Sequence, residues 1–218
     1  LTKGVHMNLP TKITITRIVA IILMVIALFV MSLFSFNTPL LGDTRINLVF
    51  LILCAFFLLA SFTDYLDGHL ARKNNQVTDL GKFLDPVADK LLINSMVIFL
   101  VAPKLFATYA VEQAISFNIW CAIILIGRDI VVDALRFIAA QKKIVIAANI
   151  FGKAKTVLQM VAITFVLLNG FPFNYFDSSW PAGLHITDFI VYIATAVSLL
   201  SGIIYVIQNR QVFKEVKK

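Results

Sequence analysis

The sequence predicts an all-α protein that crosses a membrane several times. Hydrophobic residues make up 60% of the 218 residues and charged residues only 14%, and the mean hydropathy is +0.89. Soluble domains are roughly half apolar and about one quarter charged, so the composition excludes an ordinary soluble domain. Inside a bilayer the backbone must satisfy its own hydrogen bonds, and long apolar runs therefore form helices.

Six apolar stretches are candidates to cross a bilayer, which takes about 17–25 residues in a helix. They cover residues 18–36, 46–63, 83–102, 117–139, 154–168 and 186–207, and the fifth is the shortest. Polar segments at 37–45, 64–82, 103–116, 141–153 and 169–185 separate them. We therefore expect a polytopic integral membrane protein with six transmembrane helices and a short juxtamembrane helix at the N-terminus.

No linker or repeat divides the chain, so we expect residues 7–218 to form a single membrane domain. Leu1–His6 precede Met7 and are expected to be an added remnant. The first apolar stretch is too long for the core of a cleaved signal peptide and lacks a small-residue cleavage site. We therefore expect this stretch to be retained as a helix.

Basic residues are distributed unevenly between the two sides of the membrane. If both termini share one side, only Arg45 and Lys104 of the 19 lysines and arginines lie on the other. The positive-inside rule then places both termini and the polar segment 64–82 in the cytoplasm, as expected for a bacterial cell membrane. This topology and contact with anionic membrane lipids explain the net charge of +7. Nucleic-acid binding is not expected, because the chain lacks a basic, aromatic soluble module.

The most informative segment follows the second apolar stretch, where a membrane protein tolerates charge least. Eight residues fall there at fixed spacing: Asp64, Asp67, Gly68, Ala71, Arg72, Gly81, Asp85 and Asp89. The first two aspartates are three residues apart and the last two are four apart, so each pair shares one face of a helix. Converging carboxylates repel unless a cation lies among them, and oxygen-only ligands suit Mg²⁺, Mn²⁺ or Ca²⁺. The pattern predicts a hard-metal site at the membrane surface.

This pattern, D-x2-D-G-x2-A-R-x8-G-x3-D-x3-D, resembles the signature of the CDP-alcohol phosphotransferases, and every specified position is matched. The resemblance implies transfer of a phosphatidyl group from a CDP-linked lipid to an alcohol, with release of CMP. It also implies two divalent cations, Mg²⁺ or Mn²⁺, held by Asp64, Asp67, Asp85 and Asp89. In the family the fourth aspartate is the proposed general base, which would make Asp89 catalytic.

The same resemblance assigns the CDP-lipid site. The residues concerned are Asp64, Asp67, Gly68, Ala71, Arg72 and Gly81. The small residues would let the nucleotide approach the helix backbone, and Arg72 would pair with phosphate. A solvated acidic loop is the plainer alternative for the whole segment. Asp85, which precedes Pro86, can alternatively cap a helix, and Asp79 is interpreted as a solvated loop charge.

A second group of charges bears on the acceptor alcohol. It consists of Arg128, Arg136, Lys153 and Lys155. One interpretation is internal ion pairing, with Asp129 and Asp133, plus topology-setting lysines. The other is a cationic pocket for an anionic alcohol such as glycerol 3-phosphate. Within this group Lys155 is expected to set topology or contact lipid headgroups rather than the acceptor.

Residues 8–17 and 127–159 also resemble the phosphatidylglycerophosphate synthase branch of this family. The chain departs from the branch at Gly127-Arg128-Asp129, where Ala-Arg-Glu is common. The resemblance implies that CDP-diacylglycerol and glycerol 3-phosphate give phosphatidylglycerophosphate and CMP, in a homodimer. Open alternatives are another acceptor (inositol phosphate, serine or phosphatidylglycerol) or, from other classes, a divalent-cation transporter or a prenyltransferase. A transporter would place its carboxylates near the bilayer midplane, and a prenyltransferase lacks the D-G-x2-A-R core.

Overall fold

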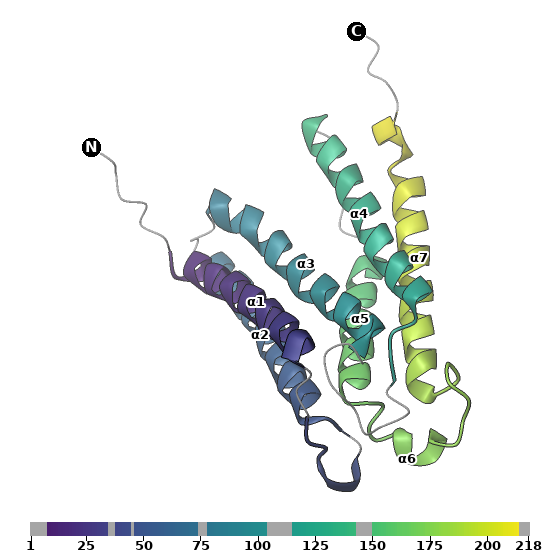
Figure 1. Cartoon of the computed structure of the whole chain (residues 1–218). Helices are drawn as coiled ribbons and strands as arrows, with labels where there is room; N and C mark the ends of the chain where they lie inside the picture. Colours follow the sequence, from purple (N-terminus) through teal and green to yellow (C-terminus); the bar gives the residue numbers. More distant parts are fainter. Residues whose placement is uncertain are drawn as a thin grey trace. The chain divides into compact units, whose positions relative to one another are not determined.

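The computed structural model describes residues 8–34, 38–44, 46–73, 78–103, 115–142 and 150–213 (Figure 1). These residues form six long helices: α1 (Leu9–Phe34), α2 (Leu48–Lys73), α3 (Asp79–Val101), α4 (Ile119–Gln141), α5 (Ile150–Leu167) and α7 (Ile186–Gln208). Three short helical segments accompany them: η1 (Gly42–Thr44), α6 (Asn174–Asp177) and η3 (Arg210–Phe213). The all-α class is confirmed, and each of the six apolar stretches falls mainly in one long helix.

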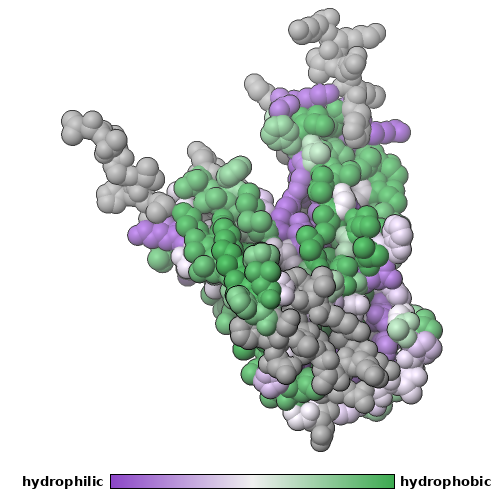
Figure 2. All heavy atoms as spheres, in the orientation of Figure 1, coloured by the Kyte–Doolittle hydropathy of each residue, from purple (hydrophilic) through white to green (hydrophobic). Residues whose placement is uncertain are grey.

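Within the described residues, three helical segments are long and apolar enough to cross a membrane. They are Leu9–Phe34, Leu48–Leu66 and Ile186–Gln208, with hydropathies of 2.8, 2.1 and 2.3. Figure 2 shows hydrophobic residues covering much of the visible face of α1. Large apolar side chains such as Leu23 and Phe29 on α1 are exposed there, which is favourable only against lipid or protein. The chain is a membrane protein, and the count of six spans stays a prediction.

The helices begin and end differently from the sequence prediction at two places. The N-terminal juxtamembrane segment is not a separate helix in the described chain, because α1 runs without interruption from Leu9 to Phe34. The polar segment 64–82 is largely helical: α2 continues to Lys73 and α3 already begins at Asp79. Hydrophobicity alone ended the second predicted helix too early and started the third too late, because polar residues extend both helices beyond their apolar parts.

The start of α3 corrects two interpretations of single aspartates. Thr78 is the N-cap, and its side chain accepts a hydrogen bond from the Gly81 amide at 3.0 Å. Asp85 and Pro86 therefore lie inside the helix, and Asp85 does not cap it. Asp79 is the first residue of the helix rather than part of a loop. A threonine hydroxyl can cap a helix N-terminus in place of a carboxylate, and here the helix already begins six residues before Asp85.

The chain divides into two compact units, Leu1–Ala114 and Ile115–Lys218. In the first unit α1 packs against both α2 and α3. Its core contains fully buried Phe57, Met96 and Leu100, and the rings of Phe50 and Phe99 meet edge to face at 5.4 Å. This packing places the end of α2 and the start of α3, which together carry the motif, beside α1.

In the second unit α7 packs against both α4 and α5. Leu125, Ile163 and Val191, one from each helix, are among its buried residues. The end of α4 is tied to η3, where the Lys142 ammonium donates to the Val212 carbonyl at 2.8 Å. This arrangement brings the charged residues of α4 and α5 against small and hydroxyl residues of α7.

Candidate active site

The eight motif residues occupy two helices of the first unit. Asp64, Asp67, Gly68, Ala71 and Arg72 lie in the last part of α2, and Gly81, Asp85 and Asp89 lie in the first part of α3. The side chains of Asp67, Ala71 and Arg72 fall outside the described residues. The prediction that each aspartate pair lies on a helix is thus confirmed.

Arg17 on α1 pairs with the first motif aspartate. Its Nη1 lies 2.5 Å from Asp64 Oδ1, and the arginine side chain is only 3% exposed while that of Asp64 is 40% exposed. Burial of a guanidinium is costly unless a carboxylate accompanies it. The pair therefore fixes one oxygen of Asp64 and leaves the rest of that carboxylate accessible.

Thr14 on α1 bonds the third motif aspartate. The Thr14 hydroxyl donates to Asp85 Oδ1 at 2.9 Å. A hydrogen bond to a carboxylate is stronger than one between neutral groups and restricts its orientation. Thr14 is buried, so water does not compete strongly for this hydroxyl.

Thr11 completes a row of buried polar residues on α1. Its hydroxyl lies 2.9 Å from that of Thr78, the N-cap of α3. A Cβ added at Gly81 would lie 3.1 Å from the Thr78 hydroxyl and 3.5 Å from that of Thr11, so Gly81 permits this close packing of α1 on α3. Thr11, Thr14 and Arg17 recur every three residues on one face of α1. The sequence prediction missed this row, although its spacing was a usable signal.

The carboxylates suit a divalent cation by their chemistry. Asp64, Asp85 and Asp89 supply only oxygen, and all three are partly accessible, as hard cations require. Among the side chains that the structure describes, no three acidic, histidine or cysteine groups are grouped closely enough to hold an ion. Asp67 is outside that description, so the four-ligand assignment stays a prediction.

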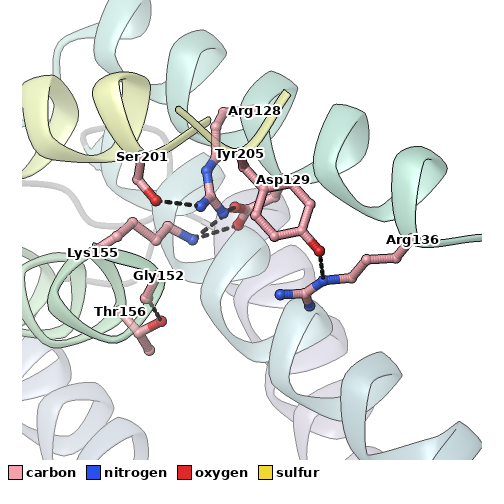
Figure 3. Close-up of polar contacts among 8 residues, drawn as sticks. All are labelled: Arg128, Asp129, Arg136, Gly152, Lys155, Thr156, Ser201 and Tyr205. Atoms are coloured by element: carbon pink, nitrogen blue, oxygen red, sulfur yellow. Dashed lines mark hydrogen bonds and ion pairs between the residues drawn. The ribbon is translucent and has the colours of Figure 1, made fainter. Parts of the chain in front are cut away.

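The acceptor candidates lie in the second unit, where an ion-pair network joins three helices (Figure 3). Lys155 Nζ on α5 lies 2.8 and 2.7 Å from the two carboxylate oxygens of Asp129 on α4. Arg128 donates through Nη1 to Asp129 Oδ1 and through Nη2 to Ser201 Oγ on α7, both at 2.9 Å. Asp129 and Lys155 are 8% and 5% exposed. The internal ion pairing that the sequence suggested is therefore present, and the cationic pocket stays a prediction.

The position of Lys155 contradicts the expectation that it contacts lipid headgroups. Its ammonium is buried on a carboxylate, so it does not face lipid headgroups. Lys153, two residues earlier, is exposed and lies on another side of α5. The structure thus brings Arg128 and Lys155 together and does not bring Lys153 to them. The pairing was missed because Asp129 and Lys155 lie on different helices.

Arg136 lies further along α4 and has its own partner. Its Nε donates to the Tyr205 hydroxyl on α7 at 3.0 Å, and its guanidinium carbon lies 5.4 Å from the centre of the tyrosine ring. Tyr205 follows Ser201 by one turn of α7, so Arg136 and Arg128 are both held by the same side of that helix (Figure 3).

Comparison with known proteins finds one family model and relatives that share a single name. The family model described as CDP-alcohol phosphatidyltransferase matches residues 7–204. A Bacillus subtilis protein named CDP-diacylglycerol–glycerol-3-phosphate 3-phosphatidyltransferase is 37% identical over 95% of this chain and 97% of its own length. Proteins of the same name from Mycoplasma pneumoniae and Rickettsia bellii are 36% and 32% identical, over 96% and 91% of this chain and 89% and 93% of their own.

Proposed function

Because the chain belongs to the CDP-alcohol phosphatidyltransferase family, we propose that it transfers the phosphatidyl group of CDP-diacylglycerol to glycerol 3-phosphate. The products are phosphatidylglycerophosphate and CMP. The observation that carries the proposal is the complete eight-residue motif on α2 and α3, with α1 residues bonded to two of its aspartates. The names of the relatives support the choice of substrates.

The proposed reaction is a direct displacement without a covalent enzyme intermediate. The acceptor hydroxyl attacks the β-phosphorus of the CDP-lipid, its proton passes to Asp89, and CMP leaves. When bound by Asp64, Asp67, Asp85 and Asp89, two divalent cations, Mg²⁺ or Mn²⁺, neutralise charge on the pyrophosphate and the leaving group. Arg17 and Thr14 keep the carboxylates of Asp64 and Asp85 in fixed orientations, which lowers the reorganisation needed during the reaction.

The remaining motif residues are proposed to bind the CDP-lipid. Gly68 and Ala71 would let the nucleotide approach the helix backbone, and Arg72 would pair with a phosphate. Gly81 would contribute indirectly, because its missing side chain lets α1 pack closely on the start of α3. Both termini and the motif are proposed to lie on the cytoplasmic side of a bacterial cell membrane, as the positive-inside rule predicts. There a water-soluble acceptor and a lipid of the inner leaflet can meet. The proposed assembly is a homodimer, as in the family that the motif resembles.

The acceptor phosphate is proposed to bind at Arg128 and Lys155, with Arg136 as a further donor and with Lys153, which is exposed on another side of α5, in a lesser role. Lys155 and Arg128 share the carboxylate of Asp129 there, so these three side chains together carry one positive charge. An anionic phosphate would offset this charge. A neutral alcohol would not, which favours glycerol 3-phosphate or inositol phosphate over serine.

The test is CMP release by the purified enzyme from CDP-diacylglycerol. Glycerol 3-phosphate, inositol phosphate, serine and phosphatidylglycerol are offered in turn, with Mg²⁺ or Mn²⁺ present or chelated. We expect turnover with glycerol 3-phosphate that is lost on chelation. Turnover with another acceptor alone would replace the proposed substrate, and none with any alcohol would reject the proposed reaction.

A further inference from the structure

The carboxylate of Asp129 bonds two cations from different helices. Lys155 Nζ contacts both of its oxygens, at 2.8 and 2.7 Å, and Arg128 Nη1 contacts Oδ1 at 2.9 Å. Two positive charges and one negative charge give these three side chains a sum of +1. Because Asp129 and Lys155 are almost fully buried, water screens this excess poorly. The group therefore attracts a further anion.

A carboxylate and a phosphate monoester present the same chemistry to such cations. Both offer several oxygens to the fork of an arginine and to the ammonium of a lysine. In the structure, Asp129 supplies the oxygens that a bound phosphate would otherwise supply to Lys155. Lys155 has three donors and Arg128 five, but both are directed at a protein carboxylate.

We propose that Asp129 is an exchangeable counterion, which Lys155 and Arg128 leave when they bind the terminal phosphate of the acceptor. This rests on the proposed function, because it takes these two cations as the phosphate site. The exchange lowers the affinity for every anion by the free energy of the ion pairs that are broken. Free inorganic phosphate is thereby kept from filling the site, and the product's phosphate is released when Asp129 recovers its partners.

The competing explanation is that Asp129 is a fixed scaffold. It predicts that removing the carboxylate changes phosphate affinity in the opposite direction. If Asp129 only holds the two cations in position, its loss disorders them and weakens phosphate binding. If it is exchanged, Asp129→Asn leaves two buried cations without their anion in the empty enzyme, a costly state that bound phosphate relieves. The variant should then bind inorganic phosphate about tenfold more tightly, or better, than the wild type.

The measurement is thermal unfolding of the full-length enzyme in lipid–detergent micelles, titrated with inorganic phosphate at constant ionic strength. Constant ionic strength removes general screening effects. We expect Asp129→Asn to show a larger rise in Tm and a lower half-effective phosphate concentration. Asp129→Glu keeps the charge, and Asp133→Asn removes a charge one turn along α4, so both should respond like the wild type. An equal or smaller response of Asp129→Asn overturns the proposal.

A second measurement covers the case in which Asp129→Asn does not fold. Phosphate-induced infrared difference spectra of the wild type should contain an aspartate carboxylate band, because that carboxylate loses its hydrogen bonds. In Asp129→Glu the band should move to the glutamate position. A spectrum without a carboxylate change rejects the exchange. Neither readout needs turnover, so absent activity with glycerol 3-phosphate would reject the proposed function separately.

Discussion

The side chain of Arg128 packs directly on Gly202 of α7. A Cβ added at Gly202 would lie 2.7 Å from Cγ and 3.5 Å from Nε of the arginine. Cγ is close to the backbone of α4 and cannot move without shifting the whole side chain. The absence of a side chain at position 202 therefore allows Arg128 to reach Ser201 across the helix interface while it also bonds Asp129 of its own helix.

Gly202→Ala should consequently displace Arg128. We expect a loss of about 1–3 kcal/mol in the free energy of unfolding from overpacking, and weaker glycerol 3-phosphate binding with CDP-diacylglycerol binding retained. Thermal unfolding and separate titration of each substrate measure the two effects. Gly127→Ala is the control, since nothing lies within 4 Å of a Cβ added there. Equal affinities in the two variants would show that Arg128 does not bind the acceptor.

Thr14→Val tests whether α1 orients the motif. The substitution keeps the shape and removes the donor to Asp85, a charged hydrogen bond worth about 1.5–3 kcal/mol. We expect kcat to fall by about tenfold to a hundredfold if that energy is used in the transition state. The control is Thr16→Val, at an exposed position of the same helix. An unchanged kcat in Thr14→Val would show that Thr14 does not orient Asp85 for catalysis.

The aspartates of the motif should be far less tolerant than their neighbour outside it. Asp67→Asn, Asp85→Asn and Asp89→Asn each remove an anionic ligand, so CMP release should fall by orders of magnitude while the protein still folds. Asp79→Asn, at the first position of α3, should stay within a few-fold of the wild type. Comparable losses at positions 79 and 67 would mean that the motif is not the site.

Replacing the basic residues of α4 and α5 should weaken binding of the acceptor without weakening binding of the CDP-lipid. Arg128→Ala and Arg136→Ala should weaken glycerol 3-phosphate binding by about 2–5 kcal/mol when the lost donor is buried against phosphate. Lys153→Ala should cost less, because this lysine is exposed and apart from Lys155. Each substrate is titrated separately. If no variant changes the affinity for glycerol 3-phosphate, the acceptor pocket lies elsewhere.

The motif could be predicted from sequence because its residues are close in the chain and follow helical spacing. The contacts that orient it could not, since Thr14 and Asp85 are 71 residues apart and Thr11 and Thr78 are 67 apart. Similarly, the charges of Lys155 and Asp129 were visible, but their pairing depends on how α4 and α5 lie on α7. Hydrophobicity also misjudged the ends of α2 and α3, because polar residues continue both helices beyond their apolar parts.

The row of Thr11, Thr14 and Arg17 has a consequence for biosynthesis. All residues that are bonded to Asp64 and Asp85 in the described contacts come from α1, and the unit Leu1–Ala114 is compact on its own. Chains emerge from the ribosome N-terminus first, and compact parts can fold in that order. The carboxylate half of the site can thus be assembled in the membrane while α4, α5 and α7 are still being translated.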